Sequence, residues 1–158
     1  NKKTVTIAAS GVGIDTLRLA TRPELTRLTG VTTAGQKAFA QAGLTPRDID
    51  VCEVHDAFSI AELMVLEELG FFERGRAGAA TREGITSLQG TLPSNPSGGL
   101  KAKGHPVGAT GIGQAVEIVT QLRGAAGDRQ VSNPRVGLTQ NMGGIGSTSV
   151  VHIFQGEN

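Results

Sequence analysis

The sequence predicts an α/β layer structure, in which helices cover a β-sheet. Short apolar runs that are typical of strands alternate with segments whose apolar residues recur at helical spacing. A length of 158 residues suits one domain, 1–158, and apolar residues make up 38% of it, enough for a core. Trp and Tyr are absent and aromatic residues account for only 3%, so we expect a core of Val, Ile, Leu and Ala side chains.

The first half of the chain is predicted to run strand, helix, strand, helix. Gly43 and Gly70 follow the two helical patterns directly and mark where those helices stop. The expected elements are, in order, a strand over 2–11 closed by Gly11, an irregular segment over 15–29, a helix over 31–42, a turn over 44–50, a short buried strand over 51–54 and a mostly buried helix over 58–69.

The second half begins with a long stretch, 73–103, that is rich in Gly, Arg and Ser. A loop of that length without regular structure is uncommon and is often functional. A helix over 108–123 follows, and the chain closes with strands over 135–140 and 147–154. The Gly-rich turn between these two strands favours an antiparallel pair.

Chemically capable residues follow the predicted strands directly. His55 comes after the strand 51–54, and Asn141 and Gly143 come after the next strand. His105 lies just ahead of the last helix. In α/β sheets, ligands bind beyond the carboxyl ends of the strands, so we expect these three loops to meet at one edge of the sheet.

His105 lies in the glycine-rich segment NPSGGLKAKGHPVGATG, residues 95–111. Unpaired N–H groups at the start of the following helix disfavour imidazolium, so His105 is expected to be neutral and able to act as a base or a hydrogen-bond donor. Glycines around it allow tight turns and close approach of a substrate or a second loop. Taken alone, a Gly-His-Pro sequence is more often only a tight connection between a loop and a helix.

Other polar residues have ordinary structural interpretations when each is taken alone. His55 is interpreted as a structural hydrogen-bonding residue, His152 as a structural residue within a strand, and Asp56 as the N-cap of the helix that follows it. Cys52 lies within an apolar strand, so an inert buried thiol is expected. No metal-ligand spacing is present, and no glycine pattern fits a dinucleotide-binding turn.

Composition excludes several classes of function. The formal net charge is +1 with the two signs interspersed, which argues against a nucleic-acid surface. No apolar run is long enough for a membrane span, and the start of the chain has no pattern of a secretory signal. One cysteine allows no internal disulfide and fits a reducing compartment, so a cytoplasmic location is expected.

The motifs EVHDAF, NPSGGLKAKGHPVGATG and NMGGIGSTSVVHIF, in this order and spacing, resemble the C-terminal half of the thiolase superfamily. The resemblance covers essentially the whole chain and is strongest to archaeal-type and sterol-carrier-protein-type thiolases, which are often called lipid-transfer proteins. It implies a thiolase-like layered fold, one half of a duplicated architecture, with a mixed sheet and helices on both faces.

The resemblance also implies roles for three residues. His105 occupies the position of the histidine that activates a nucleophilic cysteine and helps to bind the thioester oxygen. His55 takes the position of the first residue of the family's NEAF or HDCF motif, which helps to form an oxyanion site. Gly143, in the loop that matches the family's CxGG motif, would donate its N–H to a second oxyanion site. The substrate implied is a coenzyme A thioester, with no covalently bound cofactor and no metal.

Two departures from the family pattern concern cysteines. Ala57 and Asn141 stand at the two places where relatives keep an acid/base cysteine, so the resemblance implies that His55 shuttles the proton itself or with water. The nucleophilic cysteine belongs to the family's N-terminal half, and Cys52 does not match it. This chain alone is therefore expected to be inactive.

The function implied is acyl transfer to or from coenzyme A through an acyl-cysteine, as in acetyl-CoA C-acyltransferases. Implied partners are acyl-CoA, the N-terminal half, further copies in a homodimer or tetramer and, as in archaeal-type relatives, a zinc-ribbon/OB-fold protein. The sequence is also compatible with two alternatives. One is a retro-aldolase of the lipid-transfer-protein type, acting on steroid side-chain thioesters; tyrosines replace the catalytic histidines there, and this chain has no Tyr. The other is a non-catalytic lipid-binding or scaffold protein.

Overall fold

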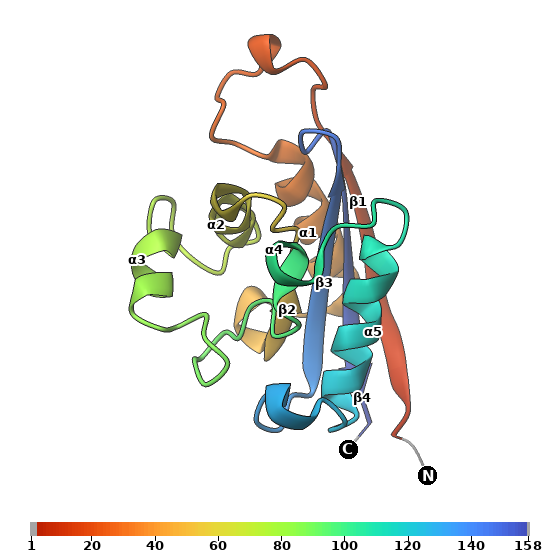
Figure 1. The fold of residues 1–158 in the computed structure, drawn as a ribbon. Helices are drawn as coiled ribbons and strands as arrows, with labels where there is room; N and C mark the ends of the chain where they lie inside the picture. The colour runs from red at the N-terminus through yellow and green to blue at the C-terminus, as the bar shows by residue number, and fades with distance from the viewer. Residues whose placement is uncertain (1–2, 158) are drawn as a thin grey trace.

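The computed structural model describes residues 3–157 and confirms a mixed four-stranded sheet with helices on both faces (Figure 1). The strands are ordered β1-β4-β3-β2 across the sheet. The elements are β1 Val5–Ile14, η1 Leu19–Thr21, α1 Thr29–Ala42, η2 Pro46–Asp48, β2 Val51–Glu53, α2 Ser59–Glu68, α3 Ala77–Arg82, α4 Gly99–Lys103, α5 Thr110–Leu122, η3 Gly127–Arg129, β3 Val136–Gly143 and β4 Thr148–Gly156.

Three strands of the sheet end at the same edge. β2 pairs parallel with β3, while β4 runs antiparallel to both β3 and β1, so β1, β2 and β3 point the same way. The predicted antiparallel pair at the end of the chain is confirmed as β3 and β4. In Figure 1, β3 runs upward to its carboxyl end, and α5 starts at the same upper side of the sheet.

Helix α1 packs closely against β1 and β4, and two glycines of β1 make this possible. A Cβ atom on Gly11 would lie 2.1 Å from the carbonyl oxygen of Ala34, and one on Gly13 would lie 2.0 Å from that of Gly30. Gly11 was expected to close the strand, and this expectation is wrong: β1 continues to Ile14 because the glycines serve helix packing rather than a turn.

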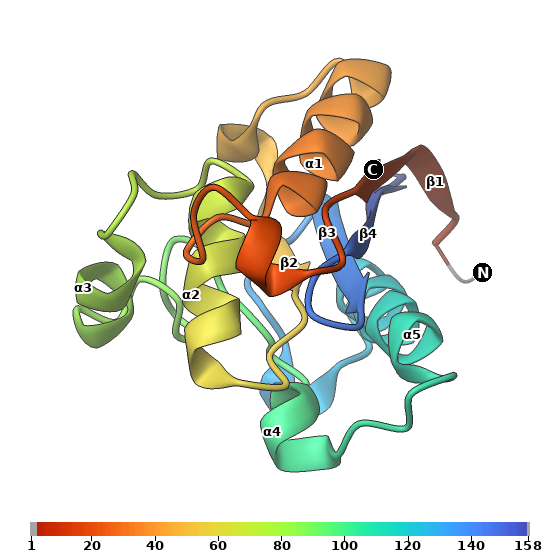
Figure 2. The same ribbon diagram turned by 90° about the horizontal axis from the view of Figure 1, so that it is seen from above.

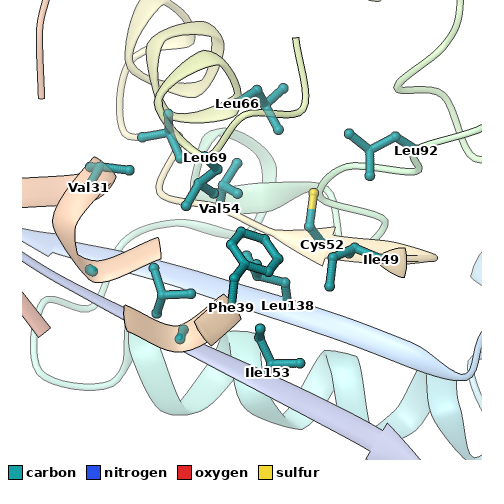
Figure 3. Close-up of a cluster of buried hydrophobic side chains, with 14 of the residues drawn as sticks. Val31, Phe39, Ile49, Cys52, Val54, Leu66, Leu69, Leu92, Leu138 and Ile153 are labelled. Atoms are coloured by element: carbon teal, nitrogen blue, oxygen red, sulfur yellow. The ribbon is translucent and has the colours of Figure 1, made fainter. Parts of the chain in front are cut away.

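The main core lies between the sheet and helices α1 and α2 (Figure 3). Its members are mostly aliphatic, as predicted, and Phe39 is the aromatic side chain at its centre in the figure. The labelled members are Val31, Phe39, Ile49, Cys52, Val54, Leu66, Leu69, Leu92, Leu138 and Ile153. Burial of such side chains contributes about 1.5–3 kcal/mol each to folding.

The stretch 73–103 is more ordered than the sequence indicates. It contains α3 and α4, and Ser94 forms an isolated parallel bridge with Cys52 beside β2. Backbone hydrogen bonds join Cys52 N to Pro93 O at 3.0 Å and Asn95 N to Cys52 O at 2.8 Å. The segment therefore occupies the free edge of β2 and extends the sheet there.

Helix α5 covers the opposite face of the sheet only in part (Figure 2). It packs with Val51 and Phe154 in a second, smaller cluster through Ile118 and Leu122. Apolar side chains beside it remain exposed: Ile7 at 65% and, on α5 itself, Ile112 at 70% and Val116 at 59%. Ile7 and Ile112 line a groove of about 400 Å³ between α5 and strands β1, β4 and β3. None of the helices formed by residues 3–157 is long and apolar enough to cross a membrane.

Candidate active site

His55 follows β2 at the edge of the sheet and is held from both its backbone and its ring. Only 5% of the residue is exposed. Its backbone N–H donates to Gln140 Oε1 at 3.1 Å, and its ring Nδ1 lies 3.4 Å from Asn141 Nδ2. Gln140 and Asn141 belong to β3, so the parallel neighbour of β2 fixes the imidazole.

His105 lies in the exposed connection between α4 and α5. Its Nδ1 is 2.6 Å from the hydroxyl oxygen of Thr110, the first residue of α5. The same hydroxyl lies 3.2 Å from the carbonyl oxygen of Pro106. Thr110 therefore orients the His105 ring toward the sheet edge while leaving the side chain accessible to solvent.

The fold brings the two histidines together although 50 residues separate them in sequence. The ring centroids of His55 and His105 are 4.9 Å apart and the ring planes are at 88°, an edge-to-face contact. Burial lowers the pKa of His55, the nearby His105 lowers it further and Asp56 partly opposes this. His55 is consequently a neutral imidazole at physiological pH.

Asp56 does not cap the helix that follows it, which corrects the expectation from sequence. Helix α2 starts at Ser59 without a side-chain cap, whereas Asp56 Oδ1 accepts a hydrogen bond from Leu100 N at 2.7 Å. Asp56 thus caps α4, the short helix that leads into the His105 loop. Gly99 is required there, because it has a φ of +63° and a Cβ atom on it would lie 2.0 Å from the Asp56 carboxylate.

A buried carboxylate that sequence reasoning missed anchors the same loop. Glu53, the last residue of β2, is fully buried and accepts hydrogen bonds from Ser97 N at 3.0 Å and Ser97 Oγ at 2.7 Å. Lys103 Nζ lies 2.6 Å from Ser97 Oγ and 3.4 Å from Glu53 Oε2. Burial raises the pKa of Glu53, and the Ser97 hydrogen bonds and Lys103 oppose the rise. The available signal was a charged residue inside the apolar run VCEV.

Asn141 lies beside His55 on β3 and connects it to α5. Its Nδ2 donates to Gln114 Oε1 at 3.1 Å, and Gln114 Nε2 donates to the backbone carbonyl of Gln140 at 3.0 Å. Gln114 is fully buried, and nothing in the motif analysis pointed to it. Gly143 lies two residues beyond Asn141 at the end of β3, where alternation along the strand places both residues on the same face.

Cys52 and His152 lie away from the two paired rings. Cys52 is fully buried in the main core, as predicted, its Sγ is 3.3 Å from Ser94 Oγ, and burial raises its pKa to about 12. Such a thiol carries little thiolate and has no access to a substrate. His152 lies in β4, half-buried, and burial lowers its pKa. Within residues 3–157, no three metal-ligating side chains gather into a candidate metal site.

Comparison with known proteins identifies what this arrangement resembles. Residues 11–156 match the family model described as thiolase C-terminal domain-like. The chain is 51% identical over 150 residues to an acetyl-CoA acetyltransferase of Methanothermobacter thermautotrophicus, an alignment that covers 95% of this chain and 39% of the relative. It is 46% identical over 122 residues to human sterol carrier protein 2, covering 77% of this chain and 22% of that protein.

A solved structure described as an Ltp2-ChsH2(DUF35) aldolase has the same fold. The TM-score is 0.89 at 27% sequence identity, and the match covers 99% of this chain and 40% of the other. The chain therefore spans about two-fifths of the acetyltransferase relative and of this structural neighbour.

Proposed function

Because the chain belongs to the thiolase C-terminal domain-like family, we propose that it is the C-terminal domain of an acyl-CoA acyltransferase of the acetyl-CoA C-acyltransferase type. The observation that carries this proposal is the pair of histidines, His55 and His105, with ring centroids 4.9 Å apart at the carboxyl edge of the sheet. The similarity to acetyl-CoA acetyltransferases supports it. The substrate is a coenzyme A thioester, and no covalently bound cofactor is required.

In the proposed reaction the nucleophile is a cysteine supplied by an N-terminal half. His105, accessible and held by Thr110, takes the thiol proton, and the thiolate attacks the acyl-CoA carbonyl and releases coenzyme A. The leaving coenzyme A thiolate takes that proton from His105. A second acetyl-CoA then loses a Cα proton to His105, directly or through a water molecule, and its carbanion attacks the acyl-cysteine carbonyl. This forms the carbon–carbon bond and releases the cysteine thiolate, which takes up a proton. The reverse direction is thiolysis.

Hydrogen-bond donors stabilise the oxygens that gain charge in these steps. His55 is proposed to donate to the thioester oxygen of the second acetyl-CoA, and the Gly143 N–H to the acyl-cysteine oxygen. Losing one such donor typically costs about 100- to 1000-fold in rate. Placement at the end of β2 and β3 suits this role, because these donors are fixed before the charge develops.

The N-terminal half is the partner that this proposal requires. The groove lined by Ile7 and Ile112, with Val116 exposed nearby, supports it, because an exposed apolar surface of this kind marks an interaction site. A homodimer or tetramer of the complete protein and a zinc-ribbon/OB-fold partner belong to the same proposal. A structural neighbour that is described together with a second protein supports the latter partner. A cytoplasmic location is proposed as well.

The alternative is a retro-aldolase that cleaves a steroid side-chain thioester, and the Ltp2-ChsH2(DUF35) aldolase favours it. The two histidines argue against it, because tyrosines are expected at these positions in such enzymes and the chain contains none. The two reactions differ in their substrates: a thiolase acts on β-ketoacyl-CoA with free coenzyme A, whereas the aldolase acts on a β-hydroxyacyl-CoA alone.

A comparison of two substrates with the complete two-half protein tests this choice. Acetoacetyl-CoA with coenzyme A and a steroid side-chain β-hydroxyacyl-CoA are offered separately, and the thioester products are measured. We expect coenzyme A-dependent formation of acetyl-CoA from the first and no cleavage of the second. Cleavage of the β-hydroxyacyl thioester alone would establish the aldolase, and turnover of neither would favour a non-catalytic lipid-binding or scaffold protein.

A further inference from the structure

The side-chain hydrogen bonds that reach the His55 ring can be followed from the backbone carbonyl of Gln140, which can only accept. Gln114 Nε2 lies 3.0 Å from the backbone carbonyl oxygen of Gln140, which only accepts. The Gln114 amide therefore has one allowed orientation, with Nε2 toward this carbonyl. The opposite orientation would place two acceptor oxygens against each other in a fully buried site.

This orientation fixes the next residue in turn. Gln114 Oε1 is left facing Asn141 Nδ2 at 3.1 Å, so Asn141 must present its NH₂ group there. An inverted Asn141 would again bring two oxygens together. The same Nδ2 lies 3.4 Å from His55 Nδ1, so the second N–H of this group is the one available to the ring nitrogen.

His55 Nδ1 consequently faces a donor and has to be the unprotonated ring nitrogen. In a neutral imidazole the proton is then on Nε2. Within residues 3–157, no hydrogen bond occupies Nε2, and this atom is not among the buried unpaired groups. The backbone N–H of His55 donates to Oε1 of the Gln140 side chain, and Nε2 of the same side chain donates to Ser149 Oγ at 3.0 Å. These two hydrogen bonds hold the His55 backbone in place beside Asn141.

We propose that Gln114 and Asn141 are positioning residues that lock His55 in the neutral tautomer with its proton on Nε2, which makes it a permanent hydrogen-bond donor toward a substrate oxygen. That the oxygen belongs to a thioester rests on the proposed function; the tautomer itself does not. A histidine locked in this way has no free lone pair on Nε2 with which to take a proton. The second proton transfer, which the family resemblance assigns to His55, therefore falls to His105 or to water.

This arrangement gives the Asn141 amide a positioning role. It stands where relatives are expected to carry an acid/base cysteine, and an amide cannot exchange protons as a thiol does. A thiol at this position would supply one weak donor and no fixed orientation. The amide instead has two N–H donors, one for Gln114 and one for His55.

Nuclear magnetic resonance of ¹⁵N-histidine-labelled chain reads the tautomer directly, since protonated and unprotonated ring nitrogens have well-separated ¹⁵N shifts. The chain has three histidines, so His55→Gln and His105→Gln variants assign the signals. We expect His55 at pH 8 with a protonated Nε2 and an unprotonated Nδ1. A protonated Nδ1, or rapid averaging between the two tautomers, would overturn the proposal.

Asn141→Asp is the decisive variant, because it replaces the donor facing Nδ1 with an acceptor. We expect the His55 proton to move to Nδ1, or both nitrogens to be protonated. Asn133→Asp is the matched control, since Asn133 is exposed near the opposite end of the sheet, and it should leave the His55 signals unchanged. Identical His55 signals in Asn141→Asp and the wild type would also refute the proposal that Asn141 fixes the tautomer of His55.

Acylation of the complete two-half protein separates this proposal from the proposed function. In Asn141→Asp we expect acyl-enzyme formation close to wild type and condensation slower by about 100-fold, the usual cost of losing one donor to an oxyanion. If the wild-type protein forms no acyl-enzyme while His55 shows the Nε2 tautomer, the proposed function fails and the tautomer proposal stands. If wild-type acylation proceeds and His55 carries its proton on Nδ1, only the tautomer proposal fails.

Discussion

The two histidines of the site differ in almost every aspect of their surroundings. His55 is buried at the end of a strand, and its ring and backbone are held by side chains from β3. His105 is exposed in a loop, and its ring nitrogen contacts a hydroxyl group only five residues further along the chain. One imidazole is fixed by long-range contacts and the other by a local one.

This difference separates two kinds of catalytic work. A donor to a developing negative charge acts best when its position is fixed before the reaction. A general base has to exist in two protonation states and to reach the proton that it moves. The Thr110 hydroxyl suits the second task, because it can accept a hydrogen bond from His105 Nδ1 or donate one to it. When it accepts from His105, it donates its own hydrogen bond to the Pro106 carbonyl oxygen.

The largest effect should come from His105→Ala in the complete protein. We expect acyl-enzyme formation to slow by at least about 100-fold, the range for loss of a general base, with an almost unchanged melting temperature because the side chain is exposed. Rapid-quench acylation with acetyl-CoA and calorimetry measure the two quantities. Lys101→Ala, an exposed change in the preceding helix, is the control, and normal acylation of His105→Ala would remove this residue from the mechanism.

His55→Ala should show the opposite pattern. Carbon–carbon bond formation should fall more than acyl-enzyme formation, and the protein should also lose stability because the side chain is buried. Single-turnover acylation, steady-state condensation and thermal unfolding separate these effects.

A thiol added at Ala57 in the His55→Ala background sharpens the assignment. If His55 acts as a hydrogen-bond donor, this thiol should leave condensation slow, whereas a recovery of turnover would show that His55 shuttles a proton. Condensation at the wild-type rate in His55→Ala would contradict both roles.

Asp56 links the two histidines, because it follows His55 directly and caps the helix that precedes His105. Asp56→Ala should cost about 1–2 kcal/mol in the free energy of unfolding, as for other helix caps, and should slow acylation by displacing the His105 loop. Urea unfolding and acylation rates test this expectation. Asp128→Ala, which changes an exposed aspartate in η3, is the control and should change neither the free energy of unfolding nor the acylation rate. If Asp56→Ala also leaves both unchanged, the His105 loop does not depend on this cap.

The smallest effect is a pH dependence of stability caused by His55. Its pKa lies below the ordinary value of 6.5 because of burial and His105, so the unfolded chain binds a proton more readily than the folded one. Stability should therefore fall as the pH drops through 6.5 toward the lower folded pKa, with a slope of at most about 1.4 kcal/mol per pH unit. His55→Asn should make this fall shallower in urea unfolding at several pH values. His152→Asn serves as a comparison, since burial also lowers the pKa of His152.

Sequence reasoning found the parts of the site that depend on strand ends. Parallel strands end at the same edge, so the placement of Asn141 beside His55 followed from the order of elements and the turn between the last two strands. The α/β class, the antiparallel β3–β4 pair and the burial of Cys52 followed from periodicity in the same way.

The missed parts depend on contacts between residues that are distant in sequence. Asp56 looks like a cap for the next helix, but its carboxylate accepts a hydrogen bond from the backbone N–H of Leu100, 44 residues away. Leu100 belongs to a short helix that could not be recognised in the sequence because the segment is rich in glycine. Gln114 is one of several buried polar side chains on α5, and its partners on β3 are visible only in the folded chain. Local patterns carry no information about which distant group will satisfy a polar side chain.

In the proposed reaction, the two histidines serve a cysteine that this chain does not contain. Incubation with radiolabelled acetyl-CoA, followed by a denaturing gel, tests it most directly. The chain alone should carry no label, because its single thiol, Cys52, is fully buried with a pKa raised to about 12. With the N-terminal half added, label should appear on that half and should depend on His105. Stoichiometric label on Cys52 of the isolated chain would contradict the account.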